Sequence, residues 1–138
     1  MPEQNARTVL MADDDAEDCL LATEAFAETG AKAAFSCVED GQELMDYLSV
    51  NSLPESKGLP ALILLDLNMP RKDGREALLE IRSQPALQHI PIVILTTSQE
   101  QRDVDFTKGA GAKAFITKPA TFDKWVEIMK SLVESWLA

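Results

Sequence analysis

Residues 59–70, LPALILLDLNMP, decide the fold. The apolar run at 61–65 is too short to cross a membrane and has no polar alternation, so it predicts a strand buried on both faces of a parallel sheet. Asp66 ends this run, and Asn68 to Pro70 stop the strand. Because functional sites of open α/β sheets lie at the carboxyl ends of the strands, Asp66 is placed where a reactive group is expected.

Short apolar runs and helical patterns alternate on both sides of this strand. We expect the other strands at residues 9–12, 33–38, 92–95 and 114–116, and helices at 16–28, at 42–48, from 73–74, after 98 and from 121. This (βα)5 alternation predicts an α/β protein of the doubly wound, flavodoxin-like class. Its parallel sheet should have the strand order 2-1-3-4-5, with helices on both faces.

Local signals refine the helix ends and the loops. Gly30 is a candidate stop for the first helix, and Ser98 with Gln101 forms a candidate capping box for the fourth. Thr121 is expected to cap the last helix. Leu20 is among the apolar positions expected to face inward in the first helix, and residues 49–58 are expected to form a surface loop.

The 138 residues suffice for one domain with a core and are too few for two. We expect a single domain over residues 1–138, with its core at about 7–134 and no room for an output domain. The net charge of −10 argues against direct binding of nucleic acid and suits a divalent cation or a basic partner. Solubility alone would explain the acidity equally well.

The two cysteines, Cys19 and Cys37, lie far apart in sequence and far from the single histidine, His89. No zinc-binding spacing is present, so we expect two thiols that pack as small hydrophobic side chains in a reducing compartment. The N-terminal residues contain no signal-peptide pattern, and no apolar stretch is long enough for a transmembrane helix. The expected location is cytoplasmic, without a membrane partner.

Polar side chains follow four of the expected strands. Asp13 and Asp14 follow the first, Asp66 the third, Thr96 the fourth and Lys118 the fifth. The strand order would bring them to one edge of the sheet. Neighbouring carboxylates repel one another unless a cation intervenes, and Mg²⁺ or Mn²⁺ is a suitable hard ion for oxygen ligands. Asp66 could then remain ionised and act as a nucleophile on phosphorus.

Each of these residues also has an ordinary structural explanation. An acid at the end of a strand often caps a helix or forms a turn, which is what we expect of Asp15. A threonine there often bonds its own turn, and a lone lysine is usually a surface charge. The argument for a site therefore depends on the whole set of strand ends.

The ordered set of motifs resembles the receiver domain of bacterial two-component response regulators over nearly the whole chain. The matching motifs are the acidic pair at 13–14, DLNMPRKDG at 66–74, TTS at 96–98, GA at 109–110 and KP at 118–119. This resemblance implies a phosphoacceptor at Asp66. It also implies metal ligands at Asp13, Asp14, Asp66 and the backbone oxygen of Asn68, with Mg²⁺ or Mn²⁺ as the cofactor.

The resemblance implies further roles at the other strand ends. Thr96 and Lys118 would sense the phosphoryl group, and Phe115 stands where the family places a switching aromatic residue, although a core role for its ring is about as well supported. Asn68 and Ser98 occupy the positions that tune hydrolysis of the acyl phosphate. The resemblance also implies that the Lys118–Pro119 bond is cis, which fits the rule that cis bonds occur essentially before proline.

Longer stretches resemble single-domain regulators that partner phytochrome-type histidine kinases. They are residues 62–76, 90–98 and 115–120, together with the extended loop at 49–58 and the SWL sequence at 135–137. The implied partner is a sensor histidine kinase such as a bacteriophytochrome. With no output domain expected, the signal would leave through the surface that such receivers form from the fourth helix, the fifth strand and the fifth helix, expected here after 98, at 114–116 and from 121.

A homodimer would use this same surface. Trp125 and Trp136 lie eleven positions apart, about three helical turns, and could form part of it or could complete the core.

Two other functions remain open. A phosphohydrolase with the same aspartyl-phosphate chemistry would carry a second acid two residues after the nucleophile, where this chain has Asn68. A receiver that acts only as a binding module would not need the acids, Thr96 and Lys118. The sequence thus favours a signalling switch over an enzyme that acts on a separate substrate.

Overall fold

Five parallel strands form one sheet in the order β2-β1-β3-β4-β5. The computed structural model describes residues 7–54, 56 and 58–137. Residues 1–6 and 138 of the expected domain lie outside the described residues. Residues 55 and 57 of the expected loop lie outside them as well. The described strands are β1 (Thr8–Ala12), β2 (Ala34–Val38), β3 (Leu62–Leu65), β4 (Ile92–Thr96) and β5 (Ala114–Thr117). The predicted strand order is confirmed.

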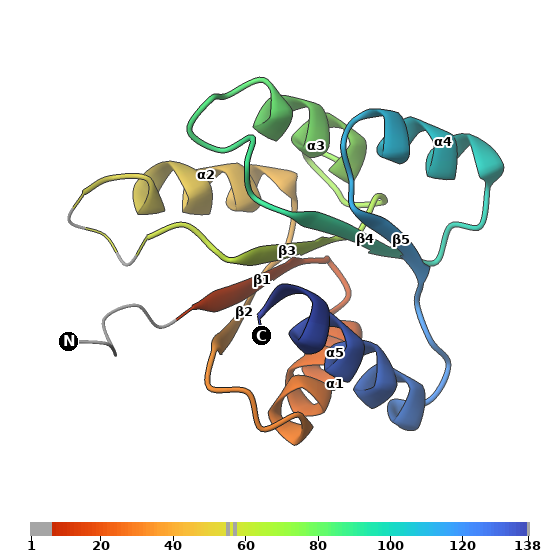
Figure 1. The fold of residues 1–138 in the computed structure, drawn as a ribbon. Helices are drawn as coiled ribbons and strands as arrows, with labels where there is room; N and C mark the ends of the chain where they lie inside the picture. The colour runs from red at the N-terminus through yellow and green to blue at the C-terminus, as the bar shows by residue number, and fades with distance from the viewer. Residues whose placement is uncertain (1–6, 55, 57, 138) are drawn as a thin grey trace.

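Helices cover both faces of this sheet, with α2, α3 and α4 on one side and α1 and α5 on the other (Figure 1). Their bounds are α1 (Ala16–Glu28), α2 (Gly41–Asn51), α3 (Gly74–Arg82), α4 (Gln101–Gly109) and α5 (Phe122–Trp136). Among the described residues, no helix is both long enough and apolar enough to span a bilayer.

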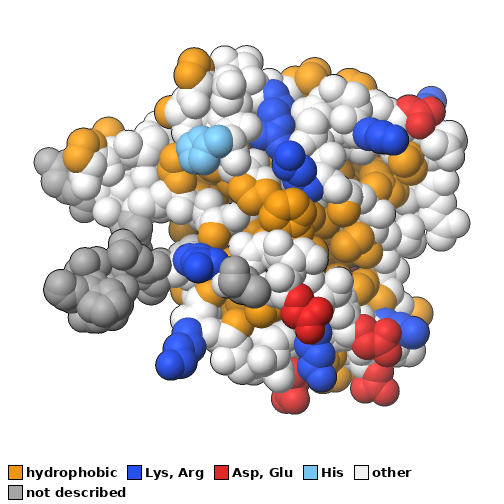
Figure 2. Space-filling view, in the orientation of Figure 1, with side chains coloured by type: hydrophobic (Ala, Val, Ile, Leu, Met, Phe, Trp, Pro, Cys, Tyr) orange, Lys and Arg blue, Asp and Glu red, His pale blue; other side chains and the backbone are white. Residues whose placement is uncertain are grey.

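The core is divided into two parts because the sheet is buried on both faces. Side chains at Leu10, Ile63 and Ile94 contribute to the part under α2 and α3, whereas neighbours such as Leu64 and Val93 face α1 and α5. Every residue of β3 is buried, which explains its unbroken apolar sequence. Figure 2 shows hydrophobic side chains grouped between the two helix layers, with charged side chains over the helices.

Polar caps determine where most helices begin. Asp15, Asp40 and Thr121 each accept backbone N–H hydrogen bonds in the first turn of α1, α2 and α5, respectively, as Ncap residues commonly do. Asp73 and Glu76 form a complete capping box at α3. The cap at Thr121 and the stop after α1, where Gly30 has φ +73°, agree with the sequence prediction.

Three local predictions were wrong. α4 begins at Gln101 after Glu100, without a side-chain cap, because the Ser98 hydroxyl bonds Asp103 and the Glu100 N–H instead. Leu20 is 57% exposed; the buried residues of α1 are Ala22, Ala25 and Phe26. α2 extends to Asn51, three residues beyond its expected end, and so takes the first part of the expected loop.

Candidate functional site

The ends of four strands bring the predicted polar residues together. Asp66 is aligned with β1 by a hydrogen bond of 3.0 Å from its N–H to the carbonyl oxygen of Ala12. Lys118 is aligned with β4 in the same way, through its N–H and the carbonyl oxygen of Thr96 at 2.8 Å. Carboxylate oxygens of Asp13, Asp14 and Asp66 consequently lie within 4.8 Å of one another.

The ammonium group of Lys118 stands among three carboxylates. Its Nζ lies 2.8 Å from Asp13 Oδ2, 2.8 Å from Asp18 Oδ2 and 3.4 Å from Asp66 Oδ2. The lysine side chain is only 8% exposed. An almost buried ammonium group needs such partners, because burying an unpaired charge is costly.

Burial and charge act in opposite directions on these groups. Burial raises the pKa of Asp13 to about 6, although the neighbouring ammonium group of Lys118 acts to lower it. Burial would lower the pKa of Lys118, but the carboxylates of Asp13 and Asp18 beside it outweigh this effect, so this pKa lies above its usual value. Lys118 therefore remains a cation at neutral pH.

The acidic group has the chemistry of a site for a hard divalent cation. Asp13 and Asp66 are buried, whereas Asp14 is exposed and would leave an open side for water and a phosphoryl oxygen. Asp13 Oδ2 is buried and accepts no hydrogen bond among the described residues; Lys118 contacts it only as an ion pair. The Asp15 side chain is used in capping α1, as expected.

Asp66 itself is held in one orientation. It is 5% exposed, and its Oδ1 accepts a hydrogen bond of 2.8 Å from the N–H of Leu67. Its Oδ2 faces Lys118. The two carboxylate oxygens are thus placed differently, one against the backbone and one toward the charged groups of the site.

Thr96 and Phe115 lie where the sequence predicted them. Thr96 is fully buried at the end of β4, and its Oγ1 accepts a hydrogen bond of 3.3 Å from the N–H of Ser98. Phe115 on β5 is partly buried and packs against the core under α2 and α3. These contacts agree with the alternative that the ring of Phe115 is part of the core.

Three sequence predictions around the site were wrong. The Lys118–Pro119 bond is trans, like every described peptide bond, and trans is the more stable form before proline by about 0.5–1 kcal/mol. Trp125 is 1% exposed, because its face of α5 packs on the sheet, so it cannot form a dimer surface. Trp136 is also partly buried against this core.

The third correction concerns the two cysteines. Cys19 on α1 and Cys37 on β2 form a disulfide rather than separate thiols, with their Cα atoms 6.5 Å apart. Their sequence separation of 18 positions hides this proximity in the sequence. The packing of α1 beside β2 creates it.

The loop between β3 and α3 is fixed on its α2 side. Arg71 has φ +64°, an uncommon conformation for a residue with a side chain, and its guanidinium group bonds both carboxylate oxygens of Asp40. The N–H of Gly41 donates to the carbonyl oxygen of Lys72 at 2.9 Å. Arg71 also holds the pKa of Asp40 below its usual value.

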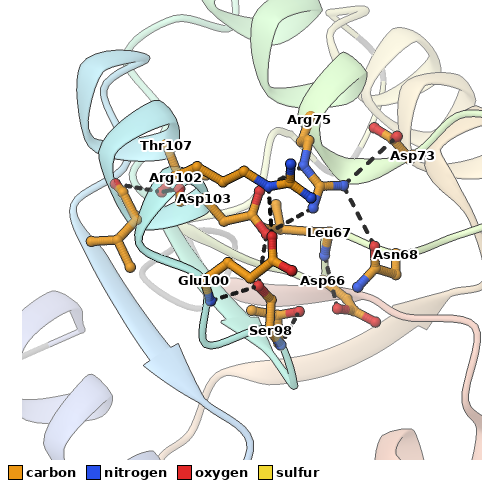
Figure 3. Close-up of polar contacts among 12 residues, drawn as sticks. Asp66, Leu67, Asn68, Asp73, Arg75, Ser98, Glu100, Arg102, Asp103 and Thr107 are labelled. Carbon is orange, nitrogen blue, oxygen red and sulfur yellow. Dashed lines mark hydrogen bonds and ion pairs between the residues drawn. The ribbon is translucent and has the colours of Figure 1, made fainter.

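A second set of polar contacts joins the first turn of α3 to α4 (Figure 3). Arg75 Nε and Nη2 each donate to Asp103, both at 2.9 Å, and Ser98 Oγ donates to Asp103 at 2.7 Å. Asp103 is 5% exposed, and its pKa is lowered by Arg75 first and by Ser98 second. Arg75 Nη1 also lies 3.5 Å from Asn68 Oδ1.

Sequence reasoning missed Asp18, Arg75 and Asp103. Asp18 could have been suspected, because it lies in the first turn of the helix that directly follows Asp13 and Asp14. Arg75 follows the recognised glycine at 74 but has no motif of its own, and Asp103 looks like an ordinary surface acid of α4.

Gly74 is required by the close approach of α3 to Asp66. A Cβ atom at this position would lie 2.1 Å from the carbonyl oxygen of Asp66. We expect Gly74→Ala to lower the free energy of unfolding by about 1–3 kcal/mol, the usual cost of overpacking. Urea denaturation measures this.

Gly109→Ala is the matched control for this prediction. It places the same methyl group in a position with no atom within 4 Å, and alanine favours a helix more than glycine does. We expect it to be neutral or slightly stabilising. Equal losses of stability in both variants would contradict the steric explanation.

Comparisons with known proteins agree with this geometry. Residues 9–130 match the family model of the response regulator receiver domain. The response regulator Rcp1 of Synechocystis sp. is 32% identical over 131 residues, which cover 95% of this chain and 89% of Rcp1.

Two solved structures extend the comparison. The phosphorylated cyanobacterial phytochrome response regulator RcpA is 37% identical, with a TM-score of 0.87 over 96% of this chain and 95% of that one. The Mn²⁺-bound form of Rcp1 is 32% identical, with a TM-score of 0.84 over 95% and 94% of the two chains. The family model, the sequence relative and the strand-end geometry lead to one conclusion: this chain belongs to the response regulator receiver domain family, among relatives of the phytochrome response regulators.

Proposed function

We propose that this chain is a phosphorylation switch that receives a phosphoryl group on Asp66 from the phosphohistidine of a sensor histidine kinase. The observation that supports this most directly is the group of three carboxylates within 4.8 Å, with the Lys118 ammonium group beside the buried Asp66. A group of this kind suits a metal-dependent transfer to a carboxylate, because it can neutralise the charge on a phosphoryl group.

In the proposed transfer, a carboxylate oxygen of Asp66 forms a bond to phosphorus while the bond from phosphorus to the donor nitrogen breaks. The electron pair of that bond stays on the donor nitrogen, and because the other ring nitrogen of the phosphohistidine carries a proton, the ring leaves as neutral imidazole. The Leu67 N–H orients Asp66, and Lys118 binds one phosphoryl oxygen. Mg²⁺ or Mn²⁺, held by Asp13, Asp14, Asp66 and the backbone oxygen of Asn68, would supply electrostatic stabilisation of the transferred group.

The response to phosphorylation is proposed to be a shift between two pre-existing conformations. Thr96 and Lys118 would engage the phosphoryl group and move α4 and β5, with Phe115 following by a change of packing. Asn68 and Ser98 are proposed to set the rate at which the acyl phosphate is hydrolysed. This self-hydrolysis would be the only turnover, because the chain is proposed to be a switch and not an enzyme with a separate substrate.

The output surface is proposed to be α4-β5-α5, and a homodimer would form there without Trp125. Phe106 on α4 and Phe122 on α5 are 39% and 37% exposed, which leaves apolar area on two of these elements. Light scattering of the phosphorylated and unphosphorylated protein would report such a dimer. An unchanged monomer in both states would contradict it.

The proposed partner is a bacteriophytochrome-type histidine kinase in the cytoplasm, with no direct contact to nucleic acid or membrane. Support comes from similarity to the phytochrome response regulator RcpA and to the bacteriophytochrome response regulator RtBRR, which is 34% identical over 92% of this chain with a TM-score of 0.76. Phosphotransfer profiling against the histidine kinases of the source organism would test the pairing. Preference for a kinase of another sensory class would contradict it.

The phosphoacceptor itself is tested with a small donor. Wild-type protein incubated with Mg²⁺ and acetyl phosphate is expected to gain the mass of one phosphoryl group in an acid-labile linkage that hydroxylamine also cleaves. Asp66→Asn and a wild-type sample treated with EDTA are expected to gain none. Failure of the wild type to react would contradict the proposal, as would equal uptake by Asp66→Asn.

A further inference from the structure

The contact between Lys118 and Asp18 joins α1 directly to the site. Asp18 belongs to the first turn of α1, and its carboxylate reaches Lys118 across a sequence separation of 100 residues. Lys118 Nζ lies closer to Asp18, at 2.8 Å, than to Asp66, at 3.4 Å. The lysine is thus held toward α1 as well as toward the proposed phosphoacceptor.

The number of donors on Lys118 makes these contacts competitive. An ammonium group has three N–H donors, and in the described part of the chain it already has three carboxylate neighbours: Asp13, Asp18 and Asp66. A phosphoryl oxygen beyond Asp66 would need one of these donors. The hydrogen bonds of Lys118 go to Asp18 and to Asp66. Once a phosphoryl group modifies Asp66, its oxygen atoms compete with Asp18 for the ammonium group.

Solvent exposure indicates which contact is exchanged. The Asp13 side chain is completely buried, so loss of its cation would leave an unpaired charge without water. The Asp18 side chain is 23% exposed, so water can replace the lysine there. The adjacent Cys19 is bonded to Cys37 of β2, which keeps this turn of α1 in position while the lysine moves.

We propose that Asp18 is a positioning residue that holds Lys118 in the resting state and gives it up when a phosphoryl group binds at Asp66. Asp18 therefore stabilises the unphosphorylated form, and its release makes the first turn of α1 a second place where phosphorylation is sensed. This inference depends on the proposed function of Asp66.

The test compares Asp18→Asn with Glu17→Gln. Both variants remove one carboxylate from the first turn of α1 at nearly constant side-chain volume, but Glu17 is exposed and is not one of the three carboxylates beside Lys118. The probe is beryllofluoride, an analogue of the phosphoryl group, titrated at saturating Mg²⁺ and followed by isothermal calorimetry. Thermal unfolding of each variant is measured in parallel.

Asp18→Asn is expected to bind beryllofluoride about five- to tenfold more tightly than the wild type, because one charge-assisted contact no longer competes for Lys118. The affinity of Glu17→Gln is expected to stay within about twofold of the wild type, because an exposed carboxylate that does not contact Lys118 has little effect on it. A merely structural role of Asp18 would lower thermal stability and weaken binding together. The proposed role instead separates the two readouts, because binding becomes tighter whatever happens to stability.

Two outcomes would overturn the inference: equal affinities of Asp18→Asn and Glu17→Gln, or weaker binding by Asp18→Asn. Failure of the proposed function would look different. In that case the wild type itself would show no Mg²⁺-dependent binding that is lost in Asp66→Asn.

Discussion

Reduction of the Cys19–Cys37 bond is expected to lower the free energy of unfolding by about 3 kcal/mol. The bond closes a loop over a sequence separation of 18 residues, and a crosslink of this span restricts the unfolded chain by about that amount. It also joins α1 to β2, next to the Lys118 contact of Asp18. Urea unfolding of oxidised and fully reduced protein would measure the difference.

The variant Cys19→Ser with Cys37→Ser is the control for this prediction. It should match the reduced wild type and should not respond to reductant. A disulfide is unusual in a reducing cytoplasm, so thiol alkylation followed by mass spectrometry in intact cells would show which form is present there. Equal unfolding midpoints with and without reductant, in protein shown to be oxidised beforehand, would contradict the stabilising role.

Substitution of Arg75 by alanine is expected to lower the free energy of unfolding by about 2 kcal/mol. The change leaves Asp103, which is 5% exposed, without its cation. Loss of a partner from a fully buried pair costs about 3–5 kcal/mol, and an exposed pair contributes about 1 kcal/mol or less. The Arg75 side chain is 31% exposed, so an intermediate value is expected.

Arg102→Ala provides the matched control. Arg102 also pairs with an acid of this region, Glu100, but its side chain is 82% exposed and that of Glu100 is 57% exposed. Its removal is expected to change stability by less than about 0.5 kcal/mol. Urea unfolding of the two variants side by side would test the difference. Equal losses in the free energy of unfolding would show that the burial of Asp103 does not increase the contribution of its ion pair.

The effect of Arg75→Ala should also depend on pH. The pKa of Asp103 is lowered in the folded protein by Arg75 and Ser98, whereas in the unfolded chain it lies near 3.9. A lowered folded pKa contributes stability that is complete above about pH 5 and is lost as pH falls through the folded pKa. The gap between wild type and Arg75→Ala should therefore narrow below about pH 4. A gap of constant size would contradict this linkage.

Much of the fold follows from patterns that are local in the sequence. The unbroken apolar run before Asp66 belongs to a strand buried on both faces, and Thr121 and Gly30 mark helix ends through their own backbone chemistry. Predictions failed where a side chain had competing partners. Ser98 matched a capping pattern, but Asp103 offered its hydroxyl a charged acceptor at 2.7 Å.

The sequence by itself determined the order of the strands, through the alternation of strands and helices that is typical of this class of fold. It also determined which groups meet, because parallel strands direct their carboxyl ends to one edge of the sheet. Tertiary packing decided which of these groups touch and what surrounds them. The contacts of Lys118 with Asp18, of Arg75 with Asp103 and of Cys19 with Cys37 join residues 100, 28 and 18 positions apart. No local pattern encodes such pairs, because each depends on how two separate elements pack against the same sheet.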